Sequence, residues 1–173
     1  MSGLSLVRPA TEHMVAAADF VAEFPEKHIN GSYGIKRTEH YAERLDVINR
    51  PRRYYDVLPE GFVPATTFFG LRKSDGLIVG ILDVRHELTE GLLKNGGNIG
   101  YSVRPTERKK GYATMMLAAA LEFCRELGLQ RALVSCDRDN PASARVIVKN
   151  GGLLENEVPE DDGNILQRYW IEL

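Results

Sequence analysis

The sequence has 173 residues, a formal net charge of -2, and 43% hydrophobic and 27% charged residues. This length suffices for one domain with a buried core, and the nearly balanced charge gives no electrostatic footprint for nucleic acid. No run approaches the roughly 20 apolar residues of a membrane-spanning helix, and Pro9, Glu12 and His13 interrupt any signal-peptide pattern. We therefore expect a single cytoplasmic domain over residues 1–173, without a nucleic-acid or membrane partner.

The first half of the chain predicts short strands and two helices. Apolar residues at helical spacing predict the helices, and Lys73-Ser74-Asp75-Gly76 is a turn signal between two β-rich runs. In chain order, we expect a strand at 4–7, a helix at 11–24, a loop at 25–35, a helix at 38–49, an irregular segment at 51–64, and strands at 66–71 and 77–88.

The second half contains the clearest helix, over residues 113–127, with Gly128 at the position of a C-terminal cap. Asn140 followed by Pro141 predicts another helix start, because asparagine caps helices and proline suits the first helical position. In chain order, we expect an excursion at 90–97, a strand at 99–103, helix 113–127, a strand at 132–136, a helix at 141–150, and a hairpin of strands at 153–158 and 165–173.

This order predicts an α/β (α+β) fold with a mixed, mostly antiparallel sheet and helices on both faces. The strand–helix–strand unit over residues 99–136 should be parallel and right-handed. Cys124 and Cys136 lie in apolar patterns and are expected to be buried free thiols, with no metal-ligand spacing in the chain.

A basic, glycine-containing turn joins the strand at 99–103 to the long helix. It carries Arg108, Lys109 and Lys110 directly before Gly111. Free backbone amides, a helix N-terminus and cationic side chains at one place favour a phosphate group, and glycine allows a diphosphate to approach the backbone closely. The alternative is an ordinary turn whose basic residues are solvated.

Arg108, Gly111 and Ala113 match the spacing R/Q-x-x-G-x-G/A, which resembles the pyrophosphate-binding turn of the GNAT superfamily of N-acetyltransferases. The resemblance extends from Leu4 to Leu173 and implies a GNAT-like fold with acetyl-CoA as co-substrate. Asn140 matches the family asparagine that reaches the cofactor arm, and its alternative role is that of an N-cap. The cofactor-binding residues that the resemblance implies are Val103, Arg108, Lys109, Lys110, Gly111, Tyr112, Ala113, Thr114, Asn140 and Ser143.

The chain departs from the family at its two commonest proton-transfer positions. Ile147 stands where many members carry a tyrosine acid, and Gly97-Asn98 stands where many carry a glutamate base. Substitutes are expected among His86, Glu87 and Tyr101. Packing is the alternative role for His86 and Tyr101, and a chain of water molecules is the alternative base.

The resemblance implies direct acetyl transfer to a primary amine of a small molecule or peptide. The competing hypothesis is a catalytically weak acyl-CoA-binding module; a dinucleotide-binding oxidoreductase is disfavoured because no G-x-G-x-x-G follows the first strand. An acidic stripe would suit a cationic amine, although the pattern favours a merely solvated helix face. The sequence leaves open whether the chain is a homodimer. The stripe is Asp19, Glu23 and Glu26, and residues that could line the acceptor cleft are His28, Tyr33 and Tyr54-Tyr55.

Overall fold

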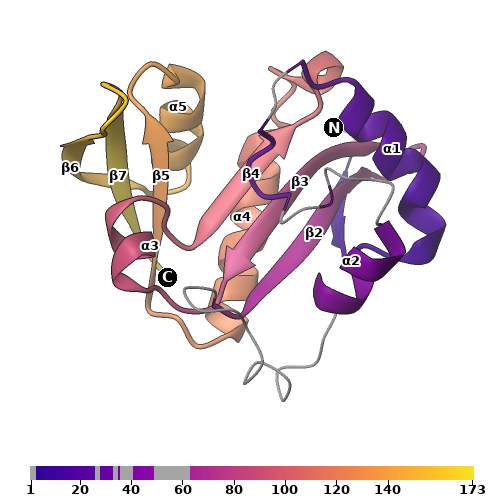
Figure 1. The fold of residues 1–173 in the computed structure, drawn as a ribbon, viewed down its shortest axis with the longest axis horizontal. Helices are drawn as coiled ribbons and strands as arrows, with labels where there is room; N and C mark the ends of the chain where they lie inside the picture. Colours follow the sequence, from indigo (N-terminus) through magenta and orange to yellow (C-terminus); the bar gives the residue numbers. More distant parts are fainter. Residues whose placement is uncertain (1–2, 26–27, 33–34, 36–40, 49–62) are drawn as a thin grey trace.

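The computed structural model describes residues 3–25, 28–32, 35, 41–48 and 63–173 (Figure 1). Several predictions fall outside the described residues: the first residues of the helix expected at 38–49, most of the irregular segment at 51–64, and the candidate site residues Glu26, Tyr33 and Tyr54-Tyr55. None of the described helices is long and apolar enough to cross a membrane. The elements are β1 (Leu4–Val7), the 3₁₀ helix η1 (Thr11–His13), α1 (Met14–Ala22), α2 (Tyr41–Ile48), β2 (Ala65–Arg72), β3 (Ile78–Arg85), α3 (Glu90–Lys94), β4 (Ile99–Val103), the 3₁₀ helix η4 (Pro105–Glu107), α4 (Tyr112–Glu126), β5 (Arg131–Asp137), α5 (Pro141–Lys149), β6 (Leu153–Pro159) and β7 (Ile165–Glu172).

Two antiparallel sheets form the centre of the described structure. One has the strand order β1-β2-β3-β4 and the other β5-β7-β6. The strands at 99–103 and 132–136 run in the same direction, as predicted, but they belong to different sheets and do not pair along their length (Figure 1). In Figure 1, β4 and β5 start close together, run in the same direction and diverge. Within the described part of the chain, an isolated bridge pairs Gly97, just before β4, with Val134 of β5.

Helices cover both faces of the four-stranded sheet, as predicted. On one face α4 contributes Met116 and Leu117 to a core that also contains Leu82 of β3 and continues into β5, α5 and β7. On the opposite face α1 and α2 bury Phe20 and Tyr41. Strand residues alternate between the two cores because successive side chains of a strand point to opposite faces. The mixed α/β architecture with antiparallel sheets is therefore confirmed.

The two cysteines are buried and free, as predicted. Gly128 has a φ of 84° directly after the C-cap of α4, which confirms the predicted cap. Asn140 is the N-cap of α5, and its side chain accepts the Ser143 N–H.

Asn98 joins β4 to β5 at the point where they begin to diverge. Its backbone N–H donates to the Leu133 carbonyl at 2.7 Å, and its side-chain Oδ1 accepts the Leu133 N–H at 2.8 Å. Its Nδ2 donates to the Arg85 carbonyl of β3 at 3.1 Å. Gly97 allows the two backbones to approach this closely, because a Cβ at this position would lie only 2.4 Å from the Leu133 carbonyl oxygen. Asn98 therefore joins β3, β4 and β5 at the point where β4 and β5 begin to diverge. We call the gap between the diverging strands the splay.

Replacing Asn98 with Ala should lower the free energy of unfolding by about 2 to 4 kcal/mol, because the Leu133 N–H and the Arg85 carbonyl would lose buried partners. Urea denaturation measures this loss. The control is Asn156→Ala, because Asn156 is exposed and bonded only to Arg168 among the described residues. Equal losses in the two variants would contradict the role assigned to Asn98.

Candidate active site

The outer edge of β4 faces the splay. The Asn98 carbonyl, just before β4, accepts the Arg85 N–H, and the Arg104 N–H, just after β4, donates to the Val79 carbonyl. Every second residue from 98 to 104 therefore turns its backbone groups toward β3. In an antiparallel ladder the residues between them turn their backbone groups to the other side. The N–H and C=O groups of Ile99, Tyr101 and Val103 therefore line the edge toward β5.

The predicted phosphate turn follows this edge directly. Lys109 and Gly111 both adopt left-handed backbone conformations, with φ of 64° and 86°, and Gly111 is the N-cap of α4. Such reversals of the chain bring successive amides together in an anion-binding concavity at the positive end of a helix dipole. A Cβ at Gly111 would meet nothing within 4 Å, so the turn opens to solvent at this position. The side chains of Arg108, Lys109 and Lys110 are exposed around it.

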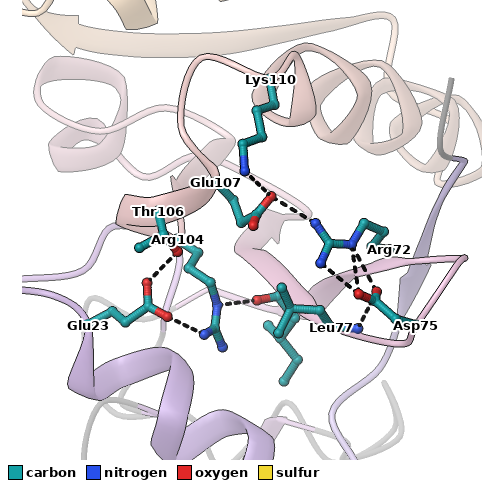
Figure 2. Close-up of polar contacts among 9 residues, drawn as sticks. Glu23, Arg72, Asp75, Leu77, Arg104, Thr106, Glu107 and Lys110 are labelled. Atoms are coloured by element: carbon teal, nitrogen blue, oxygen red, sulfur yellow. Dashed lines mark hydrogen bonds and ion pairs between the residues drawn. The ribbon is translucent and has the colours of Figure 1, made fainter.

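Glu107 is a buried carboxylate beneath this turn (Figure 2). It lies 3.0 Å from Nη1 of Arg72 and 3.1 Å from Nζ of Lys110. Hydrogen bonds to Asp75 and Tyr112 raise the pKa of Arg72, so the guanidinium stays charged beside Glu107. Lys110, predicted only as a phosphate ligand, therefore also forms an ion pair with Glu107. Sequence reasoning missed Glu107, since a glutamate in a basic turn has no pattern of its own.

The acidic residues predicted to form a stripe on the first helix have different environments. Asp19 is exposed. Glu23 is instead bonded to Arg104 and to Thr106 Oγ1, directly after β4. Its carboxylate therefore serves an internal contact, and Glu26 lies outside the described residues.

Tyr101 and the start of α5 meet across the splay. The Tyr101 hydroxyl lies 2.8 Å from Ser143 Oγ, and the Ser143 N–H donates to Asn140 Oδ1 at 3.1 Å. Burial raises the pKa of Tyr101 to about 12. The structure thus brings together Tyr101, Asn140 and Ser143, three residues that the sequence placed in the site separately. Ile147 is fully buried in the core, so nothing replaces the family tyrosine there.

His86 and Glu87 lie away from these groups. His86 follows β3 at the end where β4 begins, whereas the phosphate turn follows the other end of β4. Its Nε2 is 2.9 Å from Thr66 Oγ1, and its ring packs edge-on against Phe123 of α4. Glu87 is exposed beyond the strand. These contacts favour packing as the role of His86.

An antiparallel sheet whose β4 edge opens toward β5, followed by a basic glycine turn at the start of a helix, defines the class of N-acetyltransferase domains. A family model described as acetyltransferase (GNAT) domain matches residues 6–152. The chain belongs to this family, and the predicted enzyme class is confirmed.

Solved structures share the fold at low sequence identity. A ribosomal-protein-S5-alanine acetyltransferase from Vibrio fischeri is 14% identical with a TM-score of 0.71, covering 98% of this chain and 91% of that chain. The ribosomal alpha-N-protein acetyltransferase RimL, in complex with coenzyme A, is 17% identical with a TM-score of 0.72, covering 100% and 96%. A chimera of spermidine N-acetyltransferase SpeG from Vibrio cholerae and hSSAT is 14% identical with a TM-score of 0.65, covering 99% and 96%. No curated protein matched the sequence significantly.

Two glycines of α4 provide a matched test of the turn. Gly111 and Gly128 flank the helix with φ of 86° and 84°, and neither has a neighbour within 4 Å of an added Cβ. Alanine at either position should cost about 1 to 2 kcal/mol of stability through backbone strain. Only Gly111→Ala should also weaken CoA binding in calorimetric titration, because its methyl group would occupy the space of the diphosphate. Equal CoA affinity in both variants would show that the turn is not the phosphate site.

Proposed function

We propose that this chain transfers the acetyl group of acetyl-CoA directly to a primary amine in a ternary complex, with the α-amine of a peptide as the preferred acceptor. The observation that carries the proposal is the continuity of the β4 edge with the turn at 108–111. A cofactor with an amide-bearing arm and a diphosphate suits both parts of this surface. The metal-free chemistry of direct transfer needs only positioning, carbonyl polarisation and proton movement.

The diphosphate of acetyl-CoA is proposed to bind the amides between Lys109 and Thr114, including those of Tyr112 and Ala113. Arg108 adds a positive charge, and its Nε donates to the Val103 carbonyl at 3.3 Å, which keeps it at the end of β4. The amides of the pantetheine arm would pair with the outward groups of Tyr101 and Val103. Asn140 and Ser143 would border the arm from the side of α5.

The reaction forms a carbon–nitrogen bond and breaks the thioester carbon–sulfur bond. An outward N–H of β4 can stabilise the oxyanion without any side chain. The Tyr101 phenol, with its pKa at about 12, stays protonated and can donate a hydrogen bond to the departing sulfur. Complete proton transfer from such a phenol would be uphill, because a thiol ionises near pH 8.5. We therefore assign Tyr101 to stabilising the thiolate, which takes its proton from solvent.

The amine must lose a proton before it attacks. Asn98 is committed to Leu133 and Arg85, so it offers no base. Solvent water is then the proposed acceptor of the proton. A peptide α-amine has a pKa of about 7.7 to 8.0, against about 10.4 for a lysine-like amine, so a large fraction is neutral near pH 7.5. This difference favours a peptide terminus, and it agrees with the ribosomal-protein acetyltransferases among the structural neighbours.

The competing function is a weakly catalytic acyl-CoA-binding module. It is supported by the burial of Ile147 and by the structural commitment of Asn98. Cofactor binding is expected for both functions, and turnover separates them.

CoA release from acetyl-CoA, followed with a thiol reagent, should be faster with N-terminal peptides than with spermidine at equal concentration. The expected advantage in kcat/KM at pH 7.5 is about 10-fold or more, since the neutral fractions of the two amines differ by more than that. The advantage should shrink as pH rises toward 10. CoA binding without release above hydrolysis for any amine would support the binding module.

Tyr101→Phe should lower kcat by about 100-fold while leaving the affinity for CoA unchanged, because a donor to the leaving sulfur acts in the transition state. Ser143→Ala is the control, since it removes the hydroxyl beside the phenol and keeps the phenol itself; its kcat should fall less. Steady-state kinetics with the best peptide measures both. An unaltered kcat in Tyr101→Phe would assign the residue to packing.

A further inference from the structure

Arg104 is a buried cation directly after β4, and its side chain is only 7% exposed. Its Nε donates to the Ile78 carbonyl at 2.7 Å, and its Nη1 donates to Glu23. Its guanidinium also lies 5.6 Å from the centre of the Phe20 ring of α1. Because a buried charge without a partner carries a large desolvation penalty, Glu23 is needed for Arg104 to keep this position.

Glu23 holds the segment before the turn at two points (Figure 2). One carboxylate oxygen accepts from Arg104, and the other accepts from Thr106 Oγ1 at 2.8 Å. Burial alone would raise the pKa of Glu23, but the hydrogen bonds from Thr106 and Arg104 outweigh it and lower the pKa. The end of α1 is therefore fastened to both sides of Pro105.

Phe24, the residue after Glu23, contacts the first basic residue of the turn. The guanidinium of Arg108 lies 5.7 Å from the centre of the Phe24 ring, within the range of a cation–π contact. Phe20 and Phe24 also pack against each other, with ring centres 4.9 Å apart. Thus Glu23 and Phe24, directly after α1, together with Phe20 of α1, contact the segment 104–108 from which the phosphate turn begins.

We propose that Glu23 is a positioning residue that holds the diphosphate-binding turn in place through Arg104 and Thr106. It does not touch the cofactor; it sets where Arg108 and the following amides lie. This inference rests on the proposed function, since it concerns the same cofactor site. Coupling between two sites is reciprocal, so diphosphate binding must in turn stabilise α1.

The first test compares affinities for CoA and for pantetheine, which lacks the diphosphate. Glu23→Gln should weaken CoA binding about 10-fold, and Thr106→Val about threefold, as expected for the loss of a charged and of a single hydrogen bond. Pantetheine binding should not change. Asp19→Asn is the matched control, because it removes an exposed carboxylate one turn earlier on α1 and should bind CoA like the wild type.

The second test is hydrogen exchange of the wild-type protein with saturating CoA. Amides of α1 should exchange more slowly with CoA, and this protection should be lost in Glu23→Gln at CoA concentrations that saturate the variant. If Glu23→Gln does not fold, Thr106→Val carries both measurements. Wild-type protein that fails to bind CoA would overturn the proposed function itself. Binding by the wild type with unchanged affinity in Glu23→Gln or Thr106→Val, or without protection of α1, would overturn this inference alone.

Discussion

The divergence of β4 from β5 is the constraint on which the rest of the site depends. Had the two strands continued as a parallel ladder, the outward amides of Tyr101 and Val103 would be paired with protein. Asn98 holds the strands together at one end with backbone and side-chain hydrogen bonds to Leu133. Beyond Asn98, side chains of α4 and α5 pack against both sheets in one hydrophobic core, so the sheets are connected by packing and not by strand pairing. An edge that would otherwise attract another strand is thereby available to an amide-bearing ligand.

Two buried charged side chains, Arg104 and Glu107, precede the turn beyond this edge. Arg104 and Glu107 flank the short segment between β4 and Arg108, and each has partners on elements far away in the sequence. An anion site made of amides needs a fixed backbone, because each amide contributes only when several converge. Buried ion pairs are poor sources of net stability, but they impose geometry, since displacing one partner leaves the other charge desolvated. These ion pairs are therefore better explained by the backbone geometry that they impose before the turn than by a gain in stability.

Much of this arrangement could be predicted from local sequence patterns. Gly111, Gly128 and Asn140 are found at helix ends because their conformations or side chains satisfy requirements within a few residues. The separation of β4 and β5 into two sheets did not follow from local patterns, because the strands are joined only through residues far apart in the sequence, such as Asn98 and Leu133, 35 positions apart. The role of Glu23 was missed for the same reason, since its partner Arg104 is 81 positions away. A solvated acidic residue and one that forms a tertiary ion pair give the same helical pattern.

The proposed use of water as the proton acceptor agrees with the proposed substrate, because a peptide α-amine has a lower pKa than a lysine-like amine. Asn98 serves the architecture where many family members place a carboxylate, and its buried side chain donates to the Arg85 carbonyl, which a carboxylate could not do. An enzyme that acts on strongly basic amines must remove a proton at a cost that rises with the pKa of the amine. An enzyme that acts on a peptide terminus meets a substrate already partly neutral, so water suffices. The proposed preference for a peptide terminus therefore rests on the hydrogen bonds that commit Asn98 to Arg85 and Leu133.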